Sequence, residues 1–346
     1  MIKKKIRLGV DIGGTNTDIC AIDENSGDLM VFKLPSSKVQ SESVTKGINA
    51  IADLYGFKFE SVDRFIHGTT VATNAILETR GAKTALITTH GFKDLLEIGR
   101  QKRPDLYDLQ AEKLPTIVGR NLRFELNERI NYKGDILKEL KEHDIIELIK
   151  NLKNLGVEAV AVMFLNSYIN SANEEKVKRI IIEQMPEAYL SISSEISNQF
   201  REFERLYATV LNSFVGPEIK RYLDNLKKVL EKISIDKIYI NHSNGGIMSI
   251  NEASKYPIKT CLSGPAAGVI GAQYITNLMG YNNIITIDIG GTSTDICLIV
   301  NKQAESSSDR TISGYPVRIP SIDISTIGAG GGSIAWIDSA GVLKVG

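Results

Sequence analysis

The chain has 346 residues, of which 42% are apolar and 7% aromatic, enough for the cores of two ordinary domains or one bilobed unit. Lys and Arg together number 41, as do Asp and Glu, so no strong overall field draws the chain to nucleic acid or to an anionic membrane. We therefore expect neither as a partner, and an anionic ligand must be held by local groups.

Cysteine usage and hydropathy indicate a cytoplasmic protein. Cys20, Cys261 and Cys297 form no CxxC pair, so neither a zinc site nor a disulfide framework is expected. The opening MIKKKIRLGVDIGG reaches Asp11 before a signal-peptide core can form. The sequence contains no uninterrupted apolar run of about 18 residues, so we expect no membrane span.

Residues 5–34 predict an antiparallel meander of three strands, because short β-branched runs alternate with the turn segments GGTN and ENSGD. Helical and strand-like segments then alternate, which predicts an α/β unit with a mixed sheet. The expected helices lie at 41–56, 69–81, 91–109, 143–156 and 173–185, and the expected strands at 63–68, 83–89, 157–165 and 188–193.

A long helical stretch begins at residue 200, meets Pro217 and resumes over 218–233. We place a domain boundary here, so that residues 1–200 form the first unit and 201–346 the second. A strand at 237–243, the turn NGG, a short helix and the segment SGPAAGVIGAQYITNLMG follow.

The phrase VDIGGTNTDICAID at 10–23 returns almost unchanged as IDIGGTSTDICLIV at 287–300. Each copy ends a strand with Asp and turns on two glycines, and the backbone N–H groups of such a hairpin can surround a phosphate. Asp11 and Asp288 would hold Mg²⁺ through water. One copy could be a plain turn, but two copies favour two hairpins that grip one nucleotide, and they are too few and too distant for a solenoid. The expected phosphate contacts are Gly13, Gly14, Thr15, Thr17, Gly290, Gly291, Thr292 and Thr294.

Two further glycine-containing segments follow strands or open helices. TIGAGGGSI, with Gly328, Gly330, Gly331 and Gly332, is expected to approach the adenosine, although such a loop can also be merely flexible. LSGPAAG opens a helix with Pro265 in its first turn. Its small residues fit either anion binding at the helix start or close helix packing at a hinge, and both remain open.

Candidate substrate contacts lie in HGTTVATNA and EIGRQKRPD. Ligands of open α/β sheets gather at the C-terminal ends of strands, which makes His67 a candidate catalytic residue and Thr69 and Thr70 candidate substrate contacts. A structural His and helix-capping Thr are the alternatives. Arg100 and Arg103 could bind a substrate carboxylate, or belong to a solvated charged surface.

These motifs resemble known proteins at two levels. The two Asp-Ile-Gly-Gly-Thr hairpins resemble those of the superfamily of actin, hexokinase-type sugar kinases and Hsp70. The longer phrases resemble the hydantoinase A and 5-oxoprolinase family: HGTTVATNAILETRGAKTALITTHGFKDLLEIGRQKRPDLYDL, REFERLYATVLNSFVGP, SNGG, SGPAAG and TIGAGGGSIAW.

The resemblance implies an α/β fold of two actin-like (ribonuclease H-like) domains with mixed sheets that flank a nucleotide cleft. It implies ATP and Mg²⁺ as cofactors and a hydantoinase B-type subunit as a partner, and a homo-oligomer is also possible. Family members are commonly longer, so we expect either a truncated chain with an incomplete second domain or a short variant.

The implied activity is ATP-dependent opening of a five-membered cyclic amide or imide, such as hydantoin, N-methylhydantoin or 5-oxoproline, through a phosphorylated carbonyl. Asp11 and Asp288 would position the metal and the phosphoryl group. Two alternatives stay open: a subunit of an acetone- or acetophenone-type carboxylase, and an ATP-gated switch of the actin or Hsp70 type that transforms no small molecule.

Overall fold

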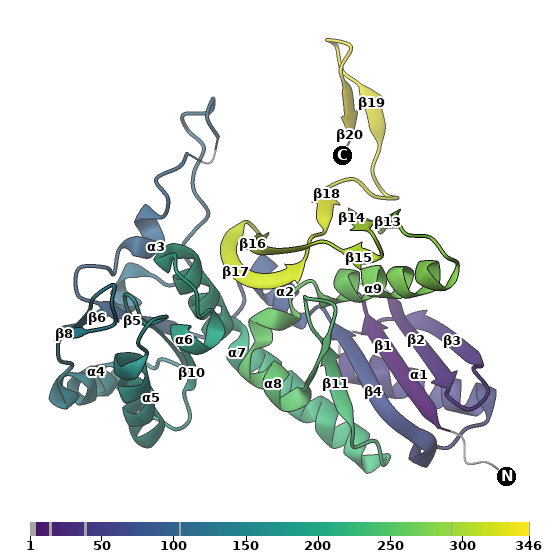
Figure 1. The fold of residues 1–346 in the computed structure, drawn as a ribbon, viewed down its shortest axis with the longest axis horizontal. Helices are drawn as coiled ribbons and strands as arrows, with labels where there is room; N and C mark the ends of the chain where they lie inside the picture. Colours follow the sequence, from purple (N-terminus) through teal and green to yellow (C-terminus); the bar gives the residue numbers. More distant parts are fainter. Residues whose placement is uncertain (1–4, 14–15, 38–39, 104, 292, 346) are drawn as a thin grey trace.

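The computed structural model describes residues 5–345 except 14–15, 38–39, 104 and 292, and describes only the backbone of 40–42. It is a mixed α/β structure in which two separate sheets lie on either side of one long helix, with a third group of strands above it (Figure 1). Among the described helices, none is both long and apolar enough to cross a membrane.

The first sheet has six strands in the order β12-β11-β4-β1-β2-β3. The antiparallel meander predicted for its beginning is confirmed. Strand β4 pairs in parallel with β1 and β11, whereas β12 pairs antiparallel with β11. The strands are β1 (Ile6–Ile12), β2 (Asn16–Asp23), β3 (Leu29–Pro35), β4 (Val62–Thr69), β11 (Ile238–Asn241) and β12 (Ile247–Ser249).

Side-chain alternation in β1 divides the first sheet into two faces. Ile6, Leu8, Val10 and Ile12 are buried, whereas Asp11 points to the opposite, open face. The buried face packs on the helices α1 (Gln40–Tyr55), α2 (Val71–Leu77) and α7 (Glu202–Lys232). The other face carries Asp11 and meets α9 (Ser263–Leu278), which contacts β4 and β11.

The second sheet is parallel, in the order β10-β9-β5-β6, and has a hydrophobic core of its own. It belongs to a unit between α2 and α7. Its elements are β5 (Thr84–Thr89), α3 (Leu95–Ile98), β6 (Arg123–Leu126), β7 (Arg129–Ile130), β8 (Ile136–Lys138), α4 (Glu142–Asn154), β9 (Ala159–Met163), α5 (Ala172–Gln184), β10 (Tyr189–Ile192) and α6 (Ser193–Ile196).

Helix α7 joins the parts of the molecule. It packs on α1 and α2 under the first sheet, on β9 and β10 of the second, and on strand β17 near the C-terminus. The predicted break at Pro217 is wrong, because α7 continues through it. Buried contacts on both sides of Pro217 outweigh the hydrogen bond that proline cannot donate.

The C-terminal part contains α8 (Ile250–Lys255), α9 (Ser263–Leu278) and several short strands. Strands β13 (Ile284–Ile289) and β14 (Thr294–Val300) repeat the antiparallel hairpin of β1 and β2. The remaining elements are β15 (Gln303–Ala304), β16 (Ser306–Ile312), β17 (Tyr315–Ile322), β18 (Ser325–Ile327), β19 (Ala335–Ile337), β20 (Leu343–Val345) and the 3-10 turns η1 (Phe59–Ser61), η2 (Arg120–Leu122) and η3 (Pro257–Thr260).

The structure differs from two further expectations. The helix predicted at 91–109 shrinks to α3, which ends at Gly99, whose φ of +57° is left-handed. The first sheet takes β11 and β12 from beyond residue 200, so the expected boundary does not coincide with the edge of a sheet. The division into two domains at residue 200 stays a prediction.

A buried polar network fastens α7 to the second sheet. Arg205, whose exposed fraction is 0%, donates to Ser167 Oγ, to Ser193 Oγ at 3.1 Å and to the Phe164 carbonyl at 2.7 Å. The same two serines donate to the buried Glu174 carboxylate, at 2.8 and 2.5 Å. Removal of the guanidinium would leave a buried carboxylate and several polar atoms without their cation.

We predict that Arg205→Met lowers the free energy of unfolding by about 3–5 kcal/mol, as loss of one partner of a buried ionic network does. Urea unfolding followed by circular dichroism measures the change. Arg221→Met, on the exposed side of the same helix, is the matched control and should change stability by less than about 0.5 kcal/mol. Equal stability of the two variants would show that the network does not hold α7.

Candidate nucleotide-binding site

The two repeated phrases form hairpins of the same geometry. In β1–β2, Asp11 pairs with Asp18 and the Gly13 N–H donates to the Asn16 carbonyl at 2.9 Å. In β13–β14, Asp288 pairs with Asp295 and the Gly290 N–H donates to the Ser293 carbonyl, also at 2.9 Å. The same sequence thus gives the same turn twice. Gly14, Thr15 and Thr292 lie outside the described residues, so their phosphate contacts stay predictions.

The fold brings the two strand-ending aspartates toward each other. Desolvation by the surrounding protein raises the pKa of the Asp11 carboxyl. The negative charge of Asp18 and, to a smaller extent, that of Asp288 from the other hairpin raise this pKa further. Two carboxylates from opposite ends of the chain therefore share one electrostatic environment. Such a pair favours a cation between or beside its members.

Two glycines make room for the Asp11 carboxylate. A Cβ on Gly68 at the end of β4 would lie 2.2 Å from Asp11 Oδ1, and a Cβ on Gly264 in the first turn of α9 would lie 3.4 Å from the same atom. The start of α9 thus faces this carboxylate, which supports the interpretation of LSGPAAG as part of the ligand cleft. Neither glycine was among the expected site residues, although both lie in the quoted motifs HGTT and SGPAAG.

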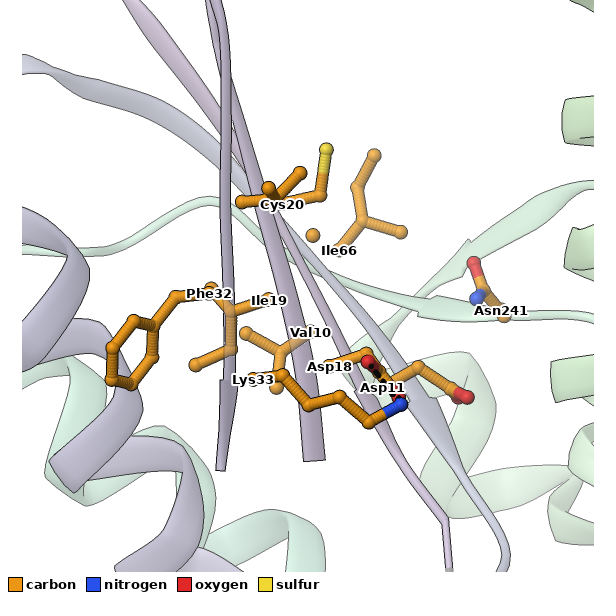
Figure 2. Close-up of a pocket in the computed structure, with 11 residues that line it drawn as sticks. Val10, Asp11, Asp18, Ile19, Cys20, Phe32, Lys33, Ile66 and Asn241 are labelled. Atoms are coloured by element: carbon orange, nitrogen blue, oxygen red, sulfur yellow. Dashed lines mark hydrogen bonds and ion pairs between the residues drawn. The ribbon is translucent and has the colours of Figure 1, made fainter. Parts of the chain in front are cut away.

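A recess of about 570 Å³ surrounds Asp11 on the open face of the first sheet. Figure 2 shows Asp11, Asp18 and Lys33 close together, with Asn241 approaching from β11. Lys33 Nζ lies 2.9 Å from Asp18 Oδ1, so this cation compensates one of the carboxylates of the hairpin. The sequence did not single out Lys33 or Asn241, because they belong to strands paired with β2 and β4 only after folding.

Threonine hydroxyls stabilise the turns of both hairpins. Thr17 and Thr294 are both buried. Thr17 Oγ1 lies 3.0 Å from Ser36 Oγ, which donates to the Gly13 carbonyl, and Thr294 Oγ1 donates to the Ala329 carbonyl at 2.6 Å. These hydroxyls stabilise the hairpins, and their expected contact with phosphate has no support in these hydrogen bonds.

The glycine-rich loop lies alongside the second hairpin. The Gly331 N–H donates to the Gly290 carbonyl at 2.9 Å, and the Gly332 N–H donates to the Gly291 carbonyl at 2.8 Å. Gly330 donates from its N–H to Ser333 Oγ, and Gly328 has open space where a Cβ would stand. The loop therefore supports the turn of the second hairpin, and its contact with adenosine stays a prediction.

His67 lies in the core, under the strand that carries Asp11. Its Nδ1 is 3.0 Å from the Val10 carbonyl, its Nε2 is 2.6 Å from Tyr222 Oη, and its exposed fraction is 0%. Burial lowers the pKa of His67 to about 4, so the ring is neutral near pH 7. This geometry supports a positioning role, because both ring nitrogens are occupied; the expected direct catalytic contact has no support here.

The remaining candidate residues, two threonines and two arginines, lie in different places: the threonines near the end of β1, and Arg100 in a second cavity beside α3 and α7. Thr69 is buried and accepts from the Val71 N–H, whereas Thr70 is half-buried and donates to the Ile12 carbonyl at the end of β1. Arg100 forms a bidentate pair with Glu204 and lines the second cavity. Arg103 is exposed and lines neither recess.

Comparison with protein families gives two matches that together cover most of the chain. The hydantoinase/oxoprolinase N-terminal region matches residues 7–185, and the hydantoinase/oxoprolinase domain matches residues 205–346. The chain belongs to the hydantoinase/oxoprolinase family. The resemblance carried by the two hairpins and the intervening motifs is confirmed.

Individual relatives agree with this assignment. The caprolactamase subunit alpha of Pseudomonas jessenii is 32% identical over 100% of this chain and 51% of its own length. The crystal structure of the ATP-dependent caprolactamase from that organism has a TM-score of 0.89 at 31% identity, over 98% of this chain and 50% of the other. 5-Oxoprolinase 1 of Arabidopsis thaliana is 31% identical over 96% of this chain and 28% of its own length.

The nucleotide-free structure of an acetone carboxylase has a TM-score of 0.84 at 24% identity, over 99% of this chain and 51% of the other, and is similar in fold. The expected fold class, an α/β structure of two actin-like units with mixed sheets, is confirmed by these neighbours. The chain spans about half the length of the caprolactamase subunit, and less of the 5-oxoprolinase.

We predict that Gly332→Ala weakens nucleotide binding, because the new Cβ would stand 2.9 Å from the Gly291 carbonyl oxygen and push the loop from the second hairpin. A loss of about tenfold in ATP affinity is expected, measured by isothermal titration calorimetry. Gly271→Ala, at an exposed position of α9 outside the loop, is the matched control, since nothing lies within 4 Å of its Cβ position. If Gly332→Ala binds ATP with the affinity of the parent, this loop is not part of the nucleotide site.

We also predict that His67 makes stability depend on pH. Its pKa of about 4 is below the ordinary 6.5, so its contribution is present above pH 6.5 and is lost as pH falls toward 4. The loss amounts to at most about 3 kcal/mol. Urea unfolding between pH 7 and 4 should show a shallower slope for His67→Gln than for the parent.

His143→Gln, at an exposed histidine, is the control and should keep the slope of the parent. Imidazole NMR of the parent provides an independent measurement if His67→Gln does not fold. A His67 resonance that titrates near pH 6.5 would contradict the buried neutral ring.

Proposed function

We propose that this chain carries the nucleotide site of an ATP-dependent enzyme that hydrolyses a cyclic amide. The observation that carries the proposal is the pair of hairpins of the same geometry, each with an aspartate near the end of its first strand, together with the effect of the Asp288 charge on the pKa of Asp11. Family membership supports it, as does the caprolactamase, whose crystal structure is described as ATP-dependent. The expected five-membered ring is one possibility, and the relative's name widens the class to larger lactams.

The donor set around the two aspartates fits Mg²⁺. Ionised carboxylates only accept hydrogen bonds, and Mg²⁺ commonly takes one or two of them while keeping several waters. Among the residues that the structure describes, no group of three or more His, Cys, Asp or Glu could hold a metal ion. Bound there, Mg²⁺ would neutralise charge on the phosphates.

The protein itself would hold and orient the phosphates of the nucleotide. The backbone N–H groups of both hairpins would bind the phosphate oxygens, and the start of α9 would add its own N–H groups beside Asp11. His67 and Tyr222 fix the end of β1, so that the Asp11 carboxylate keeps its direction. Closure of the two hairpins around the nucleotide would keep water from the γ-phosphate.

The chemistry that this site supports begins with attack of the ring carbonyl oxygen on the γ-phosphorus, which forms an O–P bond and releases ADP. Water then adds to the activated carbon, and the C–N bond breaks as the nitrogen takes a proton. A second water releases inorganic phosphate and leaves a carboxylate. Phosphorylation lowers the barrier because it removes the resonance stabilisation of the amide.

A carboxylase subunit is the second candidate, because the acetone carboxylase structure shares the fold. There the same hairpins would serve to phosphorylate a ketone enol or bicarbonate. A second subunit of hydantoinase B type is the proposed partner, since the caprolactamase relative is named as a subunit. Assembly into a homo-oligomer is compatible with either activity.

We predict that Asp288→Ala and Asp11→Ala each reduce ATP hydrolysis by about 100-fold or more while the fold is kept. Phosphoryl transfer depends on stabilising the charge of the transferred phosphoryl group, which is the role proposed for these two carboxylates and their Mg²⁺. The assay measures ADP release in the full-length protein with any subunit that co-purifies, with hydantoin, caprolactam or 5-oxoproline added. Asp28→Ala, at an exposed carboxylate between β2 and β3, is the control.

If both aspartate variants hydrolyse ATP at the rate of the parent, the assignment of the nucleotide site to these hairpins is wrong. One ring opened per ATP supports the amidohydrolase, whereas turnover stimulated only by acetone or acetophenone with bicarbonate supports the carboxylase. No stimulation by either class of compound would leave the ATP-gated switch.

A further inference from the structure

The second cavity lies where three distant segments meet. It has a volume of about 900 Å³, between the loops around α3, the first turns of α7 and the β16–β17 hairpin. The tip of the hairpin closes it, because Tyr315 Oη donates to the Pro115 carbonyl at 2.8 Å. Segments from the second-sheet unit and from the C-terminal part therefore enclose one space.

A groove connects this cavity with the nucleotide hairpins. Glu204, Thr311 and Pro316 line both the cavity and the groove, and the groove continues to Leu262 and Thr326. Thr326 Oγ1 donates to the Asp295 carboxylate of the second hairpin at 2.5 Å. Leu262 immediately precedes α9, whose Gly264 faces Asp11. A ring held in the cavity thus has a path to the transferred phosphoryl group.

The walls of the cavity are aromatic. The rings of Tyr207 and Tyr315 are stacked with centroids 5.6 Å apart, and Phe203 meets Tyr207 edge-on at 5.1 Å. The hydroxyls of Thr116 and Thr311 also line the space and can exchange hydrogen bonds with a carbonyl or an N–H. This aromatic part of the wall, with its neutral hydroxyls, suits a small uncharged ring.

The charges that line the cavity cancel. The charged residues are three cations and three anions: Arg100, Lys102, Lys113, Glu97, Glu112 and Glu204. Arg100, the best candidate to bind a carboxylate, already donates from Nε to Glu204 Oε1 at 2.8 Å and from a second nitrogen to Oε2. The guanidinium group of Arg100 is therefore already paired with a carboxylate of the protein itself.

The arginines of the connecting groove are paired in the same way. Arg201 lies 3.0 Å from Asp309, and Arg310 lies 3.3 Å from Asp323. An anionic ring bound by Arg100 would have to displace Glu204, which is only 13% exposed and would lose its cation. Of the two lysines that also line the cavity, Lys113 already donates from Nζ to the Glu97 and Ile98 carbonyls. Leaving a partly buried carboxylate unpaired opposes that exchange.

Resting on the proposed function, we propose that the cavity lined by Arg100, Glu204, Tyr207 and Tyr315 binds the substrate ring, and that this ring is uncharged, a neutral lactam or imide rather than 5-oxoproline. Glu204 is a specificity-determining residue, because it occupies the guanidinium that a substrate carboxylate would need.

Two rings that differ only in a carboxylate provide the test. 2-Pyrrolidinone and 5-oxoproline are titrated into the full-length protein, with any co-purifying subunit and a non-hydrolysable ATP analogue, and ATP turnover is measured with these rings, hydantoin and caprolactam. The parent should bind 2-pyrrolidinone about tenfold or more tightly than 5-oxoproline. In Glu204→Gln the ratio of the two dissociation constants should shift toward 5-oxoproline by about tenfold.

Glu195→Gln is the matched control, since Glu195 accepts from Lys178 and Lys255 outside the cavity, and it should leave both dissociation constants unchanged. A parent that prefers 5-oxoproline and turns over ATP with it would overturn the neutral-ring inference and leave the proposed function standing. An unchanged ratio in Glu204→Gln would overturn the role of Glu204. Failure of every ring to stimulate ATP turnover would overturn the proposed function and this inference together.

Discussion

The structure depends on two hairpins that bring the carboxylates of Asp11 and Asp288 into one electrostatic environment, although like charges repel each other. Each ends the first strand of a hairpin, and the negative charge of Asp288 contributes to the raised pKa of Asp11. Repulsion of this kind is offset when a cation binds at the same place. This repulsion is the physical basis of the proposed cation site.

The rigidity of that arrangement comes from the surrounding elements. His67 and Tyr222 hold the end of β1 from below, and the glycine-rich loop holds the second hairpin through two backbone hydrogen bonds. Helix α7 connects this region with the second sheet, where Arg205 fixes it through the buried serines and Glu174. Motion of the second sheet relative to the hairpins would pass through this helix.

The second cavity lies along the same connection. Glu204, in the first turn of α7, pairs with Arg100 from the loop after α3, while the neighbouring Arg205 donates to the Phe164 carbonyl after β9. Adjacent residues of one helix thus serve the cavity and the sheet. The cavity and the second sheet are therefore both attached to the first turn of α7.

The sequence by itself determined the duplicated hairpins, the three-strand meander, most helices and strands, and the family. These features depend on local chemistry: alternation of apolar residues, glycine at tight turns and long contiguous motifs. Only the tertiary structure decided that His67 turns into the core, that Thr17 and Thr294 brace the hairpins, that α7 passes through Pro217 and that Arg100 is occupied by Glu204. Those outcomes depend on partners far away in the chain, such as Tyr222 for His67, and no local pattern encodes which distant side chain will fill a given hydrogen-bonding group.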